Sequence, residues 1–202
     1  EIQVNKLEQL DESWGGCYCN TNLIDKKIVC LNDDESGNLT EGILLGLIRF
    51  NSSTLLLRRS VYLKLNGFDE SFIRHQDWEF MIRFFRYYKL CLPTKKHLLN
   101  RYHGKMSSSS NDPTGLEFVN IKKKFLSEFS DDIRSCNCPN NIFHKHWIDV
   151  ALYLLRDREY RLFFVYFVKA NSYNISSYKE LKTIIVVFLH SLFRSKCLKH
   201  RH

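Results

Sequence analysis

The stretch NSSTLLLRRSVYLKLNGFDESFIRHQDWEFMIRFFR, residues 51–86, carries the strongest indication of the fold. In its second half the apolar residues recur at the i, i+3, i+4 and i+7 spacing of an amphipathic helix, while Glu79, Arg83 and Arg86 fall on the opposite side. Asp77 precedes this run and is predicted to be the N-cap, where free N–H groups and the helix dipole favour a carboxylate. Such an acid is either a fixed general base or an ordinary helix cap, and its position alone leaves both open.

The residues before Asp77 predict a compact unit that gathers polar side chains. Residues 55–59, Leu-Leu-Leu-Arg-Arg, are typical of a short buried strand that ends in two cations. Ser60 is predicted to cap a short helix, and Gly67 to end that helix in the left-handed conformation. The loop Phe68-Asp69-Glu70 then leads to the helix that Asp77 begins.

This ordered set of motifs resembles the acceptor half of the family 2 glycosyltransferases of GT-A fold. The matching segments are Arg58-Arg59, Asn66-Gly67-Phe68-Asp69-Glu70 and Gln76-Asp77-Trp78-Glu79 with Arg83. A weaker likeness extends to Leu7–Asp25 and to Arg101-Tyr102-His103, so about the first 110 residues are covered. Two positions depart from the family pattern: Gln76 stands where the first acid is usual, and Asn66 stands where a second glycine is usual. The neutral Gln76 spares Asp77 the repulsion of a like charge.

The resemblance implies a reaction and a cofactor. A carboxylate, here Asp77, would take the proton of an acceptor hydroxyl as it attacks the anomeric carbon of a nucleotide-diphosphate sugar. Inversion of configuration follows only from the resemblance. The diphosphate would be bound by a divalent metal, Mn²⁺ or Mg²⁺, held mainly by acids upstream of Glu1. His103 is implied as a further ligand of the metal or of the diphosphate, although a single histidine is also compatible with a structural role.

Several residues of the motif are candidates for substrate binding, with a glycan or lipid-linked molecule as the expected acceptor. The carboxylates of the Asp-Glu pair could bind acceptor hydroxyls or shape the turn. The tryptophan could offer an apolar platform to a sugar ring or pack in the core. The arginine pair could bind phosphate or lie in solvent. The candidates are Gln76, Trp78, Asp69, Glu70 and Arg59.

The predicted fold class is α/β: a partial GT-A-type mixed sheet flanked by helices in residues 1–110, and a mostly α-helical extension in residues 111–202. The nucleotide-binding half of the family is expected upstream, so the 202 residues alone are expected to be inactive and to self-associate. The alternative is a non-catalytic interaction or membrane-docking fragment of a truncated transferase. Predicted helices of the first part cover residues 2–10, 43–48, 60–65 and 78–88, and its predicted strands cover 16–20, 28–31, 55–57, 90–92 and 98–102.

Seven cysteines are present, and four of them form the close pairs Cys17/Cys19 and Cys136/Cys138. Two C-x-C pairs could form a four-thiolate zinc site, but buried free thiols fit the spacing better. Free thiols in turn favour a reducing, cytoplasmic setting.

The net charge of +8 raises nucleic acid and anionic membrane as partners. No nucleic-acid-binding motif accompanies the charge, so nucleic acid is not an expected partner. Lys122–Lys124 is predicted to be a solvated face of a helix. The apolar run 184–189 is too short to span a bilayer, and a basic tail follows it. This end of the chain is predicted either to lie on the anionic inner face of a membrane or to pack against the other helices.

Overall fold

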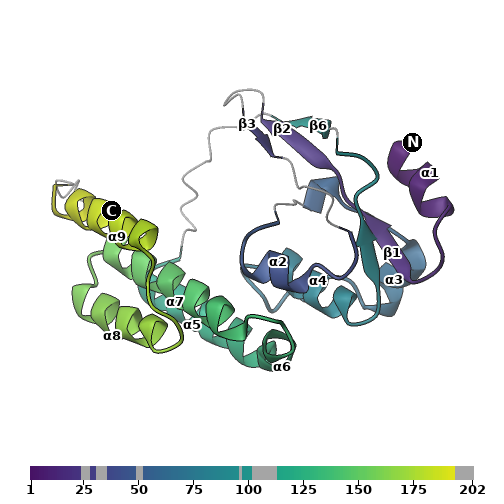
Figure 1. Cartoon of the computed structure of the whole chain (residues 1–202). Coiled ribbons are helices and arrows are strands. Elements are labelled where there is room, and N and C mark those ends of the chain that lie inside the picture. Colours follow the sequence, from purple (N-terminus) through teal and green to yellow (C-terminus); the bar gives the residue numbers. More distant parts are fainter. Residues whose placement is uncertain (24–27, 31–35, 49–51, 96, 102–112, 194–202) are drawn as a thin grey trace, which may run out of the picture. The chain divides into compact units, whose positions relative to one another are not determined.

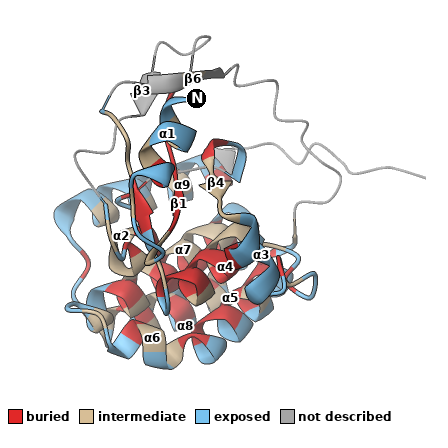
Figure 2. Ribbon diagram, turned by 90° about the vertical axis from the view of Figure 1, so that its right-hand side faces the viewer, coloured by how far each residue is buried: buried red, intermediate tan, exposed pale blue. Residues whose placement is uncertain are grey.

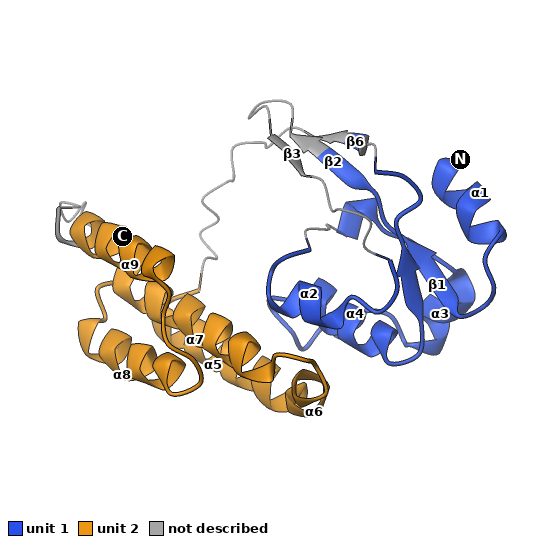
Figure 3. Ribbon diagram, in the orientation of Figure 1, with its two compact units in different colours: residues 1–111 blue, residues 112–202 orange. Residues whose placement is uncertain are grey.

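In this computed structural model the chain forms two compact units, residues 1–111 and residues 112–202 (Figure 3). The structure describes residues 1–23, 28–30, 36–48, 52–95, 97–101 and 113–193. The boundary lies next to the division that the sequence predicts near residue 110.

Unit 1 is built on two chain segments, residues 14–23 and 89–101, that run parallel through two three-stranded sheets (Figure 1). In the first sheet the order is β4 (Leu56–Leu57), β1 (Trp14–Cys17), β5 (Lys89–Cys91), and in the second it is β3 (Ile28–Cys30), β2 (Asn20–Leu23), β6 (His97–Arg101). β4 and β3 pair antiparallel with their neighbours, so both sheets are mixed, as predicted. The single strand predicted for residues 16–20 is two strands, because the chain passes from one sheet to the other at Tyr18 and Cys19.

Parallel pairing of β1 with β5 requires a crossover between them, and the motif-bearing segment supplies it. This crossover contains α2 (Thr40–Leu44), a 3₁₀ turn at Ser52–Thr54, α3 (Arg59–Lys64) and α4 (Gln76–Phe85). Its helices bury one core with Tyr18, which follows β1, and with Leu90 of β5. The crossover residues of this core are Leu39, Ile43, Ile48, Val61, Leu65, Phe80, Met81, Phe84 and Phe85. The functional motifs therefore lie on helices that are fixed by packing against the sheet.

A second, smaller core joins α1 (Ile2–Glu8) to the sheet through Leu7 and two cysteines. Cys17 and Cys91 stand directly opposite each other on the parallel strands β1 and β5, with Cα atoms 4.5 Å apart, and form a disulfide. The interpretation of Cys17 as a free thiol was therefore wrong. Its partner lies 74 residues away in the sequence, and only the strand register brings the two together. Cys19 is a buried thiol whose pKa is raised by burial.

Arg58 holds α1 to the sheet. Its guanidinium donates to the carbonyl oxygens of Leu7 (2.7 Å), Leu10 (3.0 Å) and Trp14 (2.9 Å). These bonds commit Arg58 to a structural role rather than to a phosphate. Arg58 is also the N-cap residue of α3, so the prediction that Ser60 caps this helix was wrong by two positions, although the helix itself is confirmed.

Unit 2 is helical, as predicted. Its helices are α5 (Gly115–Glu128), α6 (Ser130–Arg134), α7 (Pro139–Arg156), α8 (Tyr160–Asn171) and α9 (Tyr178–Phe193). Start signals are clear: Thr114 and Glu117 form a capping box on α5, and Pro139 occupies the first turn of α7. α7 is central and packs against α5, α8 and α9. Within the described part of the chain, no helix has both the length and the apolar character needed to cross a membrane.

Lys122 contradicts the predicted solvated lysine face. Its side chain is buried, with Nζ 2.9 Å from Nδ1 of His146 and 4.0 Å from a carboxylate oxygen of Asp149. Burial lowers the pKa of Lys122 to about 8, although the charge of Asp149 partly opposes this shift. Lys123 and Lys124 are exposed, so the prediction holds for them alone.

Candidate functional site

Asp77 lies in the first turn of α4 rather than at its N-cap. The helix begins at Gln76, and His75 takes the N-cap position with left-handed backbone angles, φ 65° and ψ 25°. Asp77 is half-buried, and its Oδ1 accepts a hydrogen bond of 3.0 Å from the backbone N–H of Trp78. The predicted N-cap was therefore wrong by two residues, but the carboxylate still lies in the first turn of the helix.

Glu79 and Arg83, which were predicted to lie on the side of the helix opposite the apolar residues, form a largely buried ion pair on α4. Nη2 of Arg83 donates to Oε2 of Glu79 at 2.8 Å, and Nε of Arg83 bonds the other carboxylate oxygen. The same guanidinium donates to the backbone carbonyls of Leu65 and Gly67. Arg83 thus ties α4 to the end of α3 and fixes the loop between them. Sequence reasoning missed this role, although the i, i+4 spacing of an acid and an arginine is a recognised pairing signal.

The turn after α3 has two successive residues in the left-handed region, Asn66 at φ 57° and Gly67 at φ 66°. The prediction for Gly67 is confirmed. A Cβ at Gly67 would also lie 2.8 Å from the hydroxyl oxygen of Tyr62, so both the backbone angle and the space favour glycine. Asparagine tolerates this conformation better than most residues, which explains how Asn66 can stand where the family has a second glycine.

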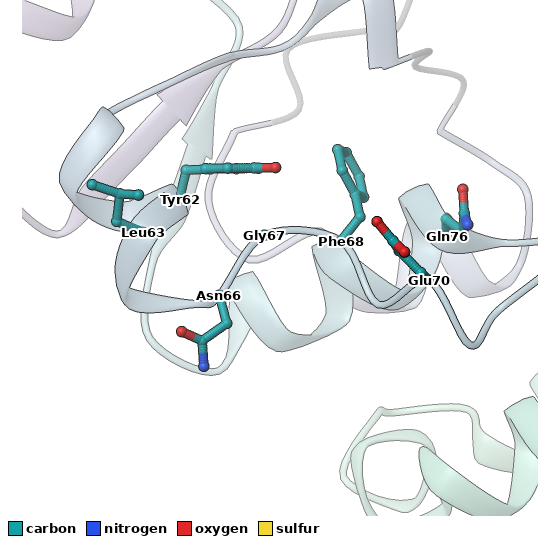
Figure 4. A pocket seen from close by; sticks show the side chains of 7 residues that line it. All are labelled: Tyr62, Leu63, Asn66, Gly67, Phe68, Glu70 and Gln76. Carbon is teal, nitrogen blue, oxygen red and sulfur yellow. The ribbon is translucent and has the colours of Figure 1, made fainter.

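A pocket of about 880 Å³ opens between α3, this turn and the start of α4 (Figure 4). In Figure 4 the side chains of Phe68, Glu70 and Gln76 rise on the same side of the loop, whereas Asn66 points to the other side. Tyr62 extends from α3 along the turn. The pocket is lined by Tyr62, Leu63, Asn66, Gly67, Phe68, Glu70 and Gln76.

The pocket combines apolar ring surface with a few polar groups. Tyr62 and Phe68 are each 38% exposed, and their ring centroids lie 6.2 Å apart. The ring of Phe68 packs against the buried ring of Phe80, with centroids 5.0 Å apart. Among the described lining residues, Glu70 is the one with a formal charge. Aromatic surface beside a carboxylate and an amide suits a ligand with both C–H faces and hydroxyl groups.

The structure brings only part of the predicted site into this pocket. Glu70 and Gln76 line it, and Asp77 directly follows Gln76 in the same helical turn. Asp69 uses Oδ1 to accept a bond of 2.8 Å from the N–H of Ser71, which is the turn-shaping role left open by the sequence. Tyr62 and Phe68 were not predicted; a motif search points to charged residues and gives no signal for a tyrosine on the preceding helix.

Two other candidates lie away from the pocket lining. Trp78 is half-buried, packs against the main core of unit 1 and stacks on His75 with centroids 4.9 Å apart. Arg59 is exposed at the start of α3. His103 and the polar loop after it lie outside the described residues.

Among the described residues, no three side chains of His, Cys, Asp or Glu come together as a metal site. The predicted ligand His103 lies outside these residues, and the other ligands of the divalent ion are expected upstream of Glu1, so the metal stays a prediction.

A comparison with known families decides the class of the protein. A family model described as glycosyltransferase like family 2 matches residues 37–150, more than half of the chain. The chain belongs to this family. The match to glycosyltransferase family 2 confirms the resemblance seen in residues 51–86, and the mixed sheet with flanking helices agrees with a partial GT-A fold.

The range of the family match differs from that of the predicted resemblance. It begins at Gly37, so the helix α1 and strands β1 to β3 precede it, and it continues into unit 2 as far as Val150 in α7. The family region therefore includes α5, α6 and most of α7, which were predicted to belong to an extension. No curated protein and no solved structure matches the chain.

Proposed function

We propose that unit 1 binds the acceptor of a glycosyl transfer in the pocket between α3 and α4, with a nucleotide-diphosphate sugar as donor. The observation that carries the proposal is the position of the acidic motif. The family's motif opens α4, and its first residue, Gln76, lines the pocket together with Glu70. Family membership supports glycosyl transfer in general, and the pocket supplies a place for one of its substrates.

Asp77 is proposed as the general base. As the acceptor oxygen attacks the anomeric carbon, its proton passes to the Asp77 carboxylate, and the bond from that carbon to the diphosphate breaks with its electron pair leaving on the diphosphate oxygen. A single displacement from the opposite face inverts the configuration. The Trp78 amide bonds Oδ1 and orients the carboxylate, so Oδ2 is available to accept the proton.

The pocket residues are proposed to orient the acceptor. Glu70 and the amide of Gln76 would bind its hydroxyl groups, and the partly exposed rings of Tyr62 and Phe68 would cover an apolar sugar face. The predicted platform residue Trp78 would instead support the first turn of α4, because it packs against the core and against His75. Donor binding through Arg59, and through a metal at His103, stays a prediction.

The test is Asp77→Asn in the full-length protein. The asparagine oxygen still accepts the Trp78 amide, so folding is retained, but the side chain no longer accepts a proton. Turnover is expected to fall about 10²-fold or more, as for loss of a general base, with nearly unchanged donor affinity. The matched control is Asp131→Asn, an exposed acid in the first turn of α6, which should leave turnover unchanged.

Near-normal turnover of Asp77→Asn would reduce Asp77 to a helix-start residue. Calorimetric titration with nucleotide-diphosphate sugars separates the alternative function. A non-catalytic interaction fragment would bind no donor, whereas the transferase binds it in both the parent and the variant.

A further inference from the structure

α9 has two faces of different character. Its inner face packs on the neighbouring helices: Glu180 lies 3.3 Å from Nε2 of His144 on α7, and buried Ser191 lies 3.3 Å from the hydroxyl of Tyr160 on α8. Its outer side carries apolar residues that are each 41–58% exposed. We call this set the outer strip; it consists of Leu181, Ile185, Val186 and Leu189.

α8 also exposes apolar residues. Its exposed face carries Phe164, Val165 and Val168, which are 58–67% exposed, while Phe163, Tyr166 and Ala170 are buried on the opposite face. The two helices are drawn against α7 in Figure 1. A helix on the surface of a folded unit normally turns its polar face outward, so the apolar outer face of each helix indicates a surface that meets an apolar phase.

The positive charge of the sequence is concentrated in its last part. Residues 160–202 contain eight Lys or Arg residues and one acid, Glu180, whereas residues 1–159 contain 22 and 21. The single acid lies on the inner face of α9 and contacts His144, so it does not offset the outer cations. On the described helices, Arg161, Lys179 and Lys182 are exposed around the apolar faces. The end of the sequence that contains α8 and α9 therefore carries nearly all of the net charge of +8.

We propose that the outer strip of α9 docks on an anionic lipid surface. An interfacial helix buries an apolar face at the headgroup boundary while flanking cations bind acidic lipids, and α9 has both properties. Since no described helix can cross a membrane, the helix lies along the surface. Charge argues against a second copy as the occupant, because pairing two such strips would bring two strongly cationic segments together. It also argues against residues 1–159 as the occupant, because they are nearly neutral overall.

The experiment is co-sedimentation of the whole chain with vesicles, either of phosphatidylcholine alone or with roughly one third phosphatidylserine. Binding is expected to the anionic vesicles and to weaken as salt is raised. Lys179→Gln with Lys182→Gln should weaken that binding by about fivefold per lysine. Ile185→Ser with Leu189→Ser should weaken it about tenfold or more, because it removes apolar area from the interface without changing the charge.

The matched control adds charge away from the strip. Asn120→Glu with Ser127→Glu places two acids on exposed positions of α5. Ile185→Glu with Leu189→Glu adds the same charge to the outer strip. The first variant should change vesicle binding far less than the second. Far-UV circular dichroism of each variant checks that the helices remain folded. Equal binding to neutral and anionic vesicles would overturn the proposal. So would equal losses in the two glutamate variants, or dimers that dissociate when the strip is made polar in a chain that binds no vesicles.

Discussion

An amphipathic helix normally buries its apolar residues and exposes its charged ones, and α4 in unit 1 and α9 in unit 2 depart from this pattern in opposite ways. α4 buries a charged residue, Glu79, on a helix that is mostly buried (Figure 2), whereas α9 exposes large apolar residues on its outer side. The buried charge of α4 is matched by Arg83, which also binds two backbone carbonyls. No such match exists for α9 among the described residues. A buried polar group with its partners present serves the fold, while an exposed apolar surface without a cover indicates a function outside it.

The largest effect is expected from breaking the ion pair of α4. Arg83→Met leaves the carboxylate of Glu79, which is 1% exposed, without its counter-charge, and the free energy of unfolding should fall by about 3–5 kcal/mol. Urea denaturation measures this change. Glu79→Leu combined with Arg83→Met should lose less than the single variant, because no buried charge is left uncompensated.

A matched control lies on α6, where Asp131 and Arg134 form an exposed pair with an N–O distance of 3.3 Å. Arg134→Met should cause no measurable change in the urea midpoint. Equal stability of Arg83→Met and Arg134→Met would mean that another group compensates the charge of Glu79. The contrast between α4 and α9 would then lose its basis.

A second prediction concerns the buried lysine of unit 2. Lys122 has a pKa of about 8 in the fold, against an ordinary value of 10.5, so between these pH values the unfolded chain binds more protons. Unfolding free energy should therefore rise as pH increases from about 8 toward 10.5, by an amount on the order of 3 kcal/mol. The increase is lost as pH falls through 8, where the buried amine is protonated beside His146, Asp149 and Lys145.

Chemical denaturation followed by helical circular dichroism at a series of pH values measures this slope. Lys122→Met retains the aliphatic stem beside Phe118 and should flatten the slope between pH 8 and 10.5. Lys123→Met, at an exposed neighbouring position, is the control and should retain the slope. A parent protein with a flat profile would mean that Lys122 is solvated.

The smallest effect on stability is expected at the outer strip. Ile185→Ser with Leu189→Ser exchanges side chains that are 58% and 45% exposed, so the urea midpoint should shift little. This variant sharpens the comparison between α9 and α4. Replacement of Phe80 or Phe84 by Ser, both fully buried on α4, should unfold unit 1. A loss of several kcal/mol from the strip variant would show that α9 packs through this face in the folded chain.

Local signals predicted the elements of the chain well. The left-handed Gly67, the helix beginning near residue 76 and the helical character of residues 115–193 all follow from short-range periodicity and turn chemistry. Errors arose at helix starts. His75 and Arg58 occupy N-cap positions although neither is a preferred capping residue, because the fixed loop and the sheet set the backbone there.

The sequence by itself determined the family, through an ordered set of motifs in residues 51–86, and the α/β class with its helical second part. Tertiary structure alone decided which distant residues meet. The register of two parallel strands joins Cys17 to Cys91, and the packing of α4 on α3 turns the Glu79–Arg83 pair inward. It also assembles Tyr62 and Phe68 with Gln76 into one pocket. The physical reason is the distance along the sequence over which each interaction acts. Helix and turn signals depend on residues a few positions apart, whereas side-chain burial and strand pairing depend on contacts between residues that are far apart in the sequence.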